Sequence, residues 1–219
     1  MEKCEEMTEC SICHKKGMNH KKCFDDICVC EECGEKGLDV IFSICLSETS
    51  KDPIRIIQKM MTQPFCHIHG PEHHAMVGCA LLCAYRNAGG EIDLKSSLVE
   101  MAKRAKCVPG GACGYWGACG ASVATGMFVS IVTGSGPLKE EPWALSVNMT
   151  SRSLEALGKI GGPRCCKRDS YLSILTAVDY VKENLHAEME KPVISCIHSA
   201  MNKQCIGERC PFHPEQKGE

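Results

Sequence analysis

Cysteine accounts for 19 of the 219 residues of this chain, and nine more residues are histidines. The chain begins MEKCEEMTEC, a charged run without the apolar core of a secretion signal. We therefore expect a cytoplasmic protein, in which reduced cysteines bind metal or react as thiolates instead of forming disulfides. We therefore expect that bound metal, held by cysteines, determines part of the fold of this chain.

The chain divides by composition into two parts. Residues 1–37 are polar, carry seven cysteines and show almost no aliphatic periodicity. Such a segment cannot bury enough apolar surface to fold unaided, so a bound metal must hold it together. From residue 38 onward apolar residues recur with helical spacing. The predicted fold is mainly α, with a helical-bundle domain at 38–219 preceded by a small zinc-knuckle or ribbon module at 1–37.

Local start and stop signals locate the helices of the second part. Asp52, Asp93 and Asp169 are expected N-caps, and Pro53 and Pro142 are expected at first helical positions. No pair of strands with alternating apolar residues is evident here. The predicted helices are 53–61, 71–87, 94–105, 121–132, 142–160 and a last one that starts after Asp169 and continues to Val181.

Charge and hydropathy exclude two classes of partner. The net charge is −2 and no Lys/Arg run exceeds two residues, so we expect no nucleic-acid partner and no anionic membrane surface. Residues 108–138 are uncharged but contain eight glycines. Their continuous apolar part is about 13–15 residues, shorter than the roughly 20 that a membrane span needs. We expect a glycine-rich loop followed by a buried helix, and no membrane partner.

Two Cys-x2-Cys pairs mark the N-terminal part. Sixteen residues separate Cys10-x2-Cys13 from Cys30-x2-Cys33, a spacing typical of a structural zinc site. Four thiolates leave no open coordination position, which favours zinc over an iron–sulfur cluster. The module would be a structural clip or a docking element for a protein partner. Spacing assigns no role to the further cysteines of this part, Cys4, Cys23 and Cys28.

A histidine-rich run, HIHGPEHH, spans residues 67–74. His67 and His69 are predicted in a loop, whereas Glu72 and His73 fall in the first turn of the next helix. Histidines so placed suit metal ligands or acid–base groups, and we select His67, His69 and His73 for proton transfer. Glu72 is equally well explained by a favourable interaction with the helix dipole.

The sequence Gly-Ala-Cys-Gly occurs twice, around Cys113 and Cys119. Glycines allow the backbone to approach a ligand closely, and their N–H groups can donate to cluster sulfides or an oxyanion. Cys119 precedes a predicted helix, whose N-terminal field lowers the pKa of a thiol. A glycine-lined helix crossing with unreactive buried thiols is the alternative.

Cys165 and Cys166 stand among cations in the run GGPRCCKRD. Arg164, Lys167 and Arg168 flank them, and a helix begins nearby, so we expect both thiols to be stabilised as thiolates. Adjacent cysteines do not easily chelate one ion together. One is therefore expected to bind a metal while the other reacts or packs. A basic surface loop with incidental thiols is the alternative.

The C-terminal cysteines are spaced Cys196-x8-Cys205-x4-Cys210. Three thiolates on an irregular segment resemble a ligand set for an iron–sulfur cluster of the [4Fe–4S] type more than a zinc knuckle. The fourth ligand would be Cys165 or Cys166. A second zinc site that includes His198 or His213 remains open.

Four blocks occur together in this chain: HIHGPEHH, VPGGACGYWGACGA, GGPRCCKRDS and CIGERCPF. In this order they resemble an uncharacterised cysteine-rich domain family of anaerobic bacteria and archaea, over roughly residues 50–212. The family also tends to carry an N-terminal Cys-x2-Cys pair of motifs, matched here by Cys10 to Cys33. It often has a histidine where this chain has Ile27. The resemblance implies the extent of the domain and an anaerobic setting, but no reaction.

The favoured hypothesis is an iron–sulfur-dependent cytosolic enzyme. A small thiol, another sulfur compound or a carboxylate would be its substrate, in a lyase, desulfidase or sulfur-transfer reaction. Cys113 or Cys119 would face the substrate, and Arg164 would offset negative charge. The alternatives are a non-catalytic metal-binding or redox-sensing protein, and a zinc-dependent hydrolase that uses the histidines with Glu72 as base.

This hypothesis requires three loops to meet. The histidine run, the Gly-Ala-Cys-Gly repeat and the Cys165–Cys166 loop each precede or open a predicted helix. Helix starts can gather at one end of a bundle, where their dipoles favour anions. We therefore expect the three loops to line one pocket.

Overall fold

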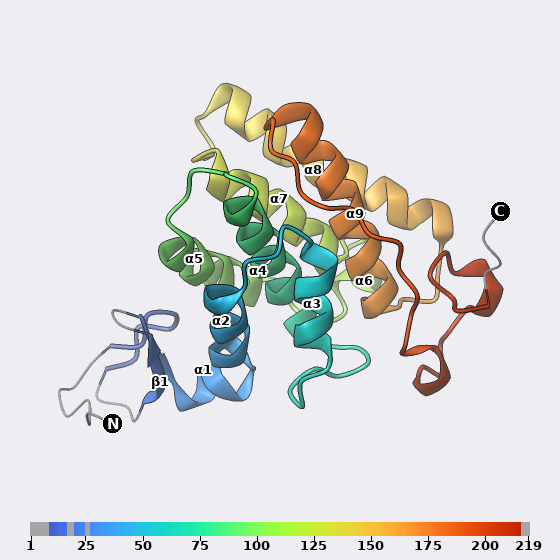
Figure 1. The fold of residues 1–219 in the computed structure, drawn as a ribbon, viewed down its shortest axis with the longest axis horizontal. Coiled ribbons are helices and arrows are strands. Elements are labelled where there is room, and N and C mark those ends of the chain that lie inside the picture. Colours follow the sequence, from blue (N-terminus) through green and yellow to red (C-terminus); the bar gives the residue numbers. More distant parts are fainter. Residues whose placement is uncertain (1–8, 17–19, 25–26, 216–219) are drawn as a thin grey trace.

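Helices make up most of the chain, and a short antiparallel ribbon precedes them (Figure 1). The computed structural model describes residues 9–16, 20–24 and 27–215. Its elements are β1 (His20–Phe24), β2 (Ile27–Cys30), α1 (Glu31–Glu35), α2 (Leu38–Ser47), α3 (Pro53–Met61), α4 (Glu72–Asn87), α5 (Leu94–Lys106), α6 (Ala112–Tyr115), α7 (Gly120–Val132), α8 (Glu140–Ile160), α9 (Cys166–Asn184) and the 3-10 turns η1 (Ser199–Met201) and η2 (Gly207–Arg209). The prediction of a mainly α fold with an N-terminal cysteine module is confirmed.

Helix α4 is the centre of the body. Residues 73–84 are all buried, and the helix contacts α2, α3, α5, α7 and α9. A helix that is apolar on every side is stable only when surrounded in this way. Gly78 allows the close approach of α5, because a Cβ there would lie 2.2 Å from Met101 Sδ. The histidine run therefore begins the most enclosed helix of the molecule.

Helices α7, α8 and α9 form the other side of the body (Figure 1). The uncharged stretch folds as predicted into a glycine-rich loop and the buried helix α7. Small side chains let the helices approach, and their hydroxyls bond to one another: Ser153 Oγ lies 2.9 Å from Ser122 Oγ, which lies 3.3 Å from Ser173 Oγ. Among the described residues, no helix is long and apolar enough to cross a membrane.

Two predicted helix starts are confirmed. Asp52 Oδ1 accepts hydrogen bonds from the backbone N–H groups of Ile54 (2.8 Å) and Arg55 (3.0 Å). Asp93 Oδ1 accepts one from Ser96 N at 2.7 Å. In both helices a carboxylate satisfies N–H groups that have no partner within the helix.

Two other predicted starts are wrong. Helix α8 begins at Glu140, so Pro142 lies within its first turn instead of opening it. Helix α9 begins at Cys166 with Cys165 as N-cap, and Asp169 is inside the helix. Asp169 Oδ2 accepts a hydrogen bond from Cys165 N at 3.3 Å, so the carboxylate holds the chain entering the helix without being the cap itself.

The N-terminal ribbon joins the body at Gly37. This residue has φ +76, and a Cβ on it would lie 2.2 Å from the Phe65 ring. Val29 and Cys33 belong to the same buried cluster as Phe42 of α2, so the ribbon packs on the helical body. The division of the chain into domains at residue 37 stays a prediction.

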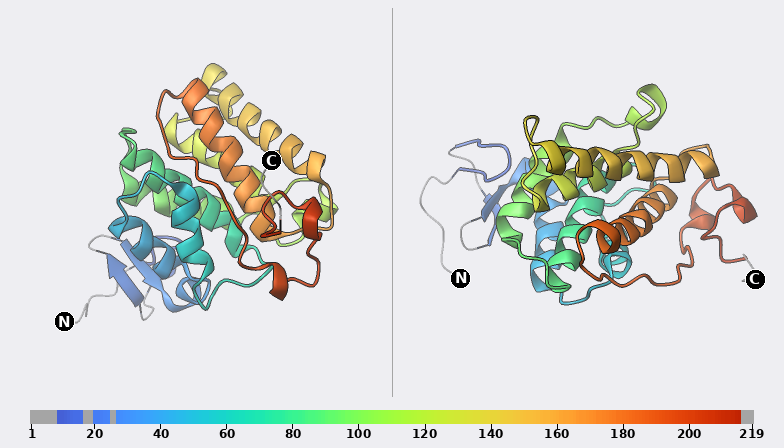
Figure 2. Two further views of the ribbon diagram at one scale, coloured as in Figure 1. Left: turned by 45° about the vertical axis from the view of Figure 1, so that its right-hand side comes forward. Right: turned by 90° about the horizontal axis from the view of Figure 1, so that it is seen from above.

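The segment after α9 runs back beside it, as the red trace in both views of Figure 2 shows. Helix α9 is about 28 Å long at 1.5 Å per residue, and Glu190 N donates to Lys51 O at 2.9 Å along the return path. Cys196 N then donates to Phe212 O at 2.7 Å, which closes the last segment into a loop. The C-terminal cysteines therefore lie near the start of α9, at the opposite end of the molecule from the ribbon.

The cap of α3 gives a direct test of this local structure. Replacing Asp52 with alanine removes both hydrogen bonds at the start of the helix and is expected to lower the free energy of unfolding by about 1 kcal/mol. Asp52→Asn keeps an accepting oxygen and should stay within roughly 0.5 kcal/mol of the wild type. Urea unfolding followed by circular dichroism measures both. Equal stability of the alanine variant and the wild type would contradict the capping role.

Candidate metal centres and substrate cavity

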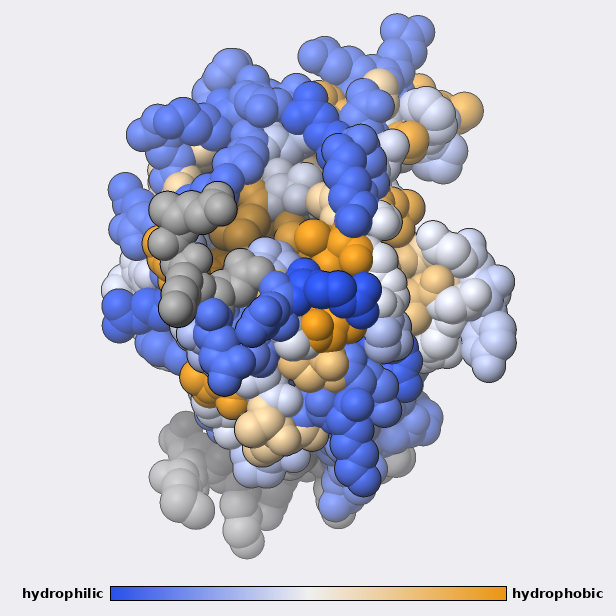
Figure 3. Space-filling view, turned by 90° about the vertical axis from the view of Figure 1, so that its right-hand side faces the viewer, coloured by the Kyte–Doolittle hydropathy of each residue, from blue (hydrophilic) through white to orange (hydrophobic). Residues whose placement is uncertain are grey.

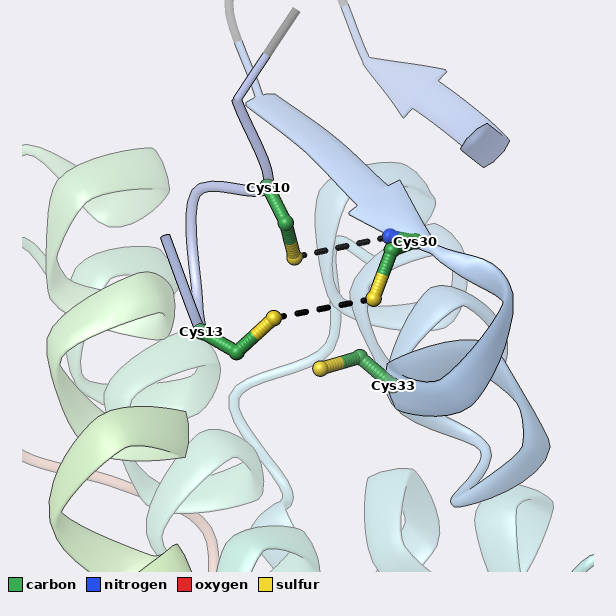
Figure 4. Close-up of side chains that lie close together, drawn as sticks. All are labelled: Cys10, Cys13, Cys30 and Cys33. Carbon is green, nitrogen blue, oxygen red and sulfur yellow. Dashed lines mark hydrogen bonds between the residues drawn. The ribbon is translucent and has the colours of Figure 1, made fainter. Parts of the chain in front are cut away.

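Four cysteines of the N-terminal part face one another (Figure 4). One ligand atom from each of Cys10, Cys13, Cys30 and Cys33 lies within 4.8 Å of all the others. Cys13 Sγ and Cys30 Sγ are 3.7 Å apart, and Cys30 N donates to Cys10 Sγ at 3.5 Å. The first pair lies in a turn before β1, and the second at the end of β2 and in α1. This four-thiol group could hold a metal ion.

Electrostatics favours a cation at this group. Burial raises the pKa of Cys10, but backbone N–H donors at Cys13, Cys30 and Ile12 outweigh it and lower the value to about 6. Burial raises the pKa of Cys33 far above its usual range, and the neighbouring Cys10 adds to the effect. Four thiolates at such distances repel one another strongly unless a metal ion lies between them.

The predicted cluster cysteines meet at the other end of the molecule. Cys165, the N-cap of α9, lines one cavity with Cys196, Cys205 and Cys210 of the C-terminal segment. Cys166 does not line it. Cys165 has an extended backbone at the N-cap and Cys166 is the first helical residue, and the two adjacent side chains line different cavities. We call this one the thiol cavity.

Hydrogen-bond donors point at these sulfurs. Arg168 N and Asn202 Nδ2 lie 3.5 Å and 3.4 Å from Cys165 Sγ, and His198 N lies 3.4 Å from Cys196 Sγ. Burial raises the pKa of Cys165, Cys196 and Cys210, although backbone donors oppose the shift at each. Without a bound cation these thiols are therefore protonated at neutral pH. Donors aimed at a sulfur are a common feature around cluster-bound thiolates.

The thiol cavity also presents buried groups without partners. Lys167 is 1% exposed and Arg168 is 5% exposed, and both line the cavity. Arg168 Nε donates to Asp169 Oδ1 at 3.1 Å, but within the described residues its Nη1 has no partner. Neither ring nitrogen of His198 has one there. Buried donors of this kind suit an electron-rich group in the cavity.

A second cavity, of about 260 Å³, lies beside the first. We call it the loop cavity, because all three predicted loops line it. Its lining includes His69, Gly70, Pro71, His73, His74, Gly110, Gly111, Ala112, Cys113, Cys119, Gly120, Ala121, Arg164, Cys166 and Asp169. The expected meeting of the histidine run, the Gly-Ala-Cys-Gly repeat and the Cys165–Cys166 loop is thus observed. The chemical roles assigned to these residues stay predictions.

Two thiols of the loop cavity, those of Cys119 and Cys166, have raised pKa values. Burial raises the pKa of Cys119 to about 12 and that of Cys166 to about 11, and the nearby Asp169 adds to both shifts. Burial also raises the pKa of Cys165. The expectation that helix starts and cations make these groups thiolates is wrong for the chain without bound metal. Burial outweighs the helix field because the side chains are withdrawn from water.

Three of the four histidines of the run, His69, His73 and His74, line the loop cavity, whereas His67 does not. The His67 side chain is 75% exposed. His69 reaches the C-terminal segment, with Nε2 at 2.8 Å from Gln204 Oε1 and 3.1 Å from Asn202 Oδ1, and it lines the loop cavity. His73 is 1% exposed, and burial lowers its pKa to about 3, so its ring is neutral at physiological pH.

A cysteine that sequence reasoning missed stands beside His73. Cys66 Sγ lies 3.8 Å from His73 Nε2 and accepts a hydrogen bond from Lys167 Nζ at 2.9 Å. Burial raises the pKa of Cys66, and Lys167 opposes the shift. One ligand atom from each of Cys66, Glu72 and His73 lies within 4.8 Å of the other two. The sequence signal was a Cys-x6-His spacing across the start of a helix.

The fold and cavities define a helical protein with separate groups of cysteines at its two ends. Residues 41–213 match a family of unknown function, DUF5714, and the chain belongs to this family. The matched range includes all four blocks from which an uncharacterised family was inferred, and it begins after the four-thiol group. No curated protein and no solved structure matches the chain.

The four-thiol group leads to a test of metal content. Cys10→Ser and Cys33→Ser are each expected to lose about one bound metal ion per chain, because three thiolates hold a structural ion far less tightly than four. Cys107→Ser, at an exposed cysteine outside the group, is the matched control and should keep the metal. Metal analysis of the purified variants measures the result. Unchanged metal content in both serine variants would contradict the site.

Proposed function

We propose that this chain is an iron–sulfur enzyme whose cluster is bound by Cys165, Cys196, Cys205 and Cys210. The observation behind this proposal is that these cysteines, from two distant parts of the sequence, line one cavity; its volume is about 20 Å³, so the C-terminal segment must move outward to admit a cluster. The ligand atoms of the four-thiol group all lie within 4.8 Å of one another. Among the described residues, the four cysteines of the thiol cavity are not that close together. A wider arrangement of thiols suits a polynuclear cluster better than a single ion.

The surroundings fit the charge of such a cluster. Four thiolates around a cubane carry net negative charge, and on the cavity wall Arg168 Nη1 and the His198 ring are buried groups without a partner among the described residues. Only Arg168 pairs with a carboxylate there, that of Asp169. A buried anionic group would therefore be compensated by the Arg168 guanidinium, whose Nη1 has no other partner among the described residues.

The loop cavity is proposed as the substrate site. The N-terminal ends of α4, α7 and α9 all contribute to its wall, through Pro71, Gly120 and Cys166. Arg164 adds a guanidinium group. Three positive helix ends and an arginine favour an anion, so a small carboxylate or thiol compound is the proposed substrate class. Cys113 and Cys119 would contact it, in a lyase, desulfidase or sulfur-transfer reaction.

Hydrogen bonds connect the two cavities. Asn202 Oδ1 lies 3.1 Å from His69 Nε2, while Asn202 Nδ2 donates to Cys165 Sγ at 3.4 Å. His69 lines the loop cavity and Cys165 the thiol cavity. Asn202 therefore joins a proposed proton-transfer group at the substrate to a proposed cluster ligand. This connection favours an enzyme over a protein that only stores or senses metal.

Adjacent cysteines provide the sharpest test of the cluster. After anaerobic purification, the wild type is expected to contain about four irons per chain with matching sulfide. Cys165→Ser should lose most of this iron, because Cys165 faces the other three cysteines. Cys166→Ser is the matched control and should retain the iron, because Cys166 faces the loop cavity. Iron and sulfide analysis with visible absorbance measures both.

The C-terminal ligands should behave like Cys165. Cys205→Ser and Cys210→Ser are each expected to abolish stable iron binding in anaerobic reconstitution. Full iron content and colour in both variants would rule out the thiol cavity as the cluster site. Equal iron loss in the Cys165 and Cys166 variants would contradict the assignment of the fourth ligand.

A further inference from the structure

Three metal-ligating side chains meet where the histidine run enters α4. Cys66 lies in the loop before the helix, and Glu72 and His73 are its first two residues. One ligand atom of each lies within 4.8 Å of the other two. Neither the four-thiol group nor the thiol cavity includes any of them.

Each of these side chains is held by a second partner. His73 Nδ1 lies 3.0 Å from Gly70 O and donates to it, which leaves Nε2, the nitrogen facing Cys66 Sγ, free to accept. Glu72 Oε1 accepts from His67 N at 2.9 Å. Metal ligands in proteins are typically oriented by such outer hydrogen bonds, which fix the histidine tautomer and the carboxylate.

Lys167 supplies the outer partner of the cysteine. Lys167 Nζ donates a hydrogen bond to Cys66 Sγ at 2.9 Å. A thiolate bound to a metal keeps lone pairs that can accept such a bond. Lys167 as a residue is 1% exposed, so its charge favours a negatively charged neighbour, and a metal-bound thiolate is one.

Charge and burial favour a divalent cation among the three ligands. The Glu72 side chain is 9% exposed and that of His73 is 1% exposed. A carboxylate and a metal-bound thiolate, both largely out of water, are stabilised by a cation that lies between them. A divalent ion would balance both charges and would take the neutral imidazole as its third ligand.

We propose that Cys66, Glu72 and His73 bind a zinc ion through one sulfur, one carboxylate and one ring nitrogen. Three protein ligands leave one of four positions for water or a small ligand, as in catalytic zinc sites. His73 lines the loop cavity, and Glu72 lines a neighbouring cavity of about 590 Å³. The ion would thus lie at the wall between two spaces that small molecules can enter. This site is independent of the proposed iron–sulfur centre.

Zinc counting on the full chain tests the proposal. Protein is purified without oxygen, and zinc and iron are measured in the same samples, so that loss of the cluster is distinguished from loss of this site. Cys66→Ser and His73→Gln should each contain about one zinc fewer per chain than the wild type, with iron unchanged. Cys107→Ser, at an exposed cysteine outside the set, should match the wild type in both metals.

Glu72→Gln and Lys167→Met keep the proposal testable if the first variants fold poorly. The amide of Glu72→Gln preserves shape and the bond from His67 N, but it is a poor zinc ligand. Lys167→Met removes the outer donor and should weaken zinc binding by about 10–100-fold in a chelator competition. Wild-type zinc content and affinity in Glu72→Gln and in any folded Cys66 or His73 variant would overturn the site.

Discussion

Three consecutive charged residues, Lys167, Arg168 and Asp169, are buried in the first turn of α9. Removing charges from water is costly unless partners compensate for them. Asp169 pairs with Arg168 at 3.1 Å, and Lys167 donates to Cys66 Sγ at 2.9 Å. Arg168 Nη2 donates to Pro163 O at 3.0 Å, and Arg168 Nη1 has no partner among the described residues. An electron-rich group beside this helix start would satisfy the donor that is left, and both proposed metal centres at this end of the molecule lie here.

The same helix start organises the two cavities. Cys165 and Cys166 are adjacent, yet one lines the thiol cavity and the other the loop cavity. Asn202 bonds to His69 on one side and to Cys165 on the other. Figure 3 views the molecule from the side on which the C-terminal segment lies, where hydrophobic surface shows between hydrophilic residues. The proposed substrate site and the proposed cluster thus lie next to each other, at the end of the molecule opposite the four-thiol group.

Local signals in the sequence predicted local structure well. Asp52 and Asp93 were identified as caps because a carboxylate before a helix satisfies free N–H groups, and the two Cys-x2-Cys pairs predicted a four-thiol group. The cap of α9 was missed because a cysteine sulfur accepts from Arg168 N where an aspartate was expected. The choice between Cys165 and Cys166, the approach of Cys66 to Lys167 and the high thiol pKa values depend on burial and long-range packing, which spacing along the chain does not encode.

Anomalous X-ray diffraction from crystals grown without oxygen would test the central claim most directly. Data collected at the iron absorption edge locate iron atoms independently of any assumed ligand. The account predicts an iron signal inside the thiol cavity, surrounded by Cys165, Cys196, Cys205 and Cys210, with Cys166 turned away from it. An iron signal elsewhere, zinc in the thiol cavity, or coordination by Cys166 would contradict it.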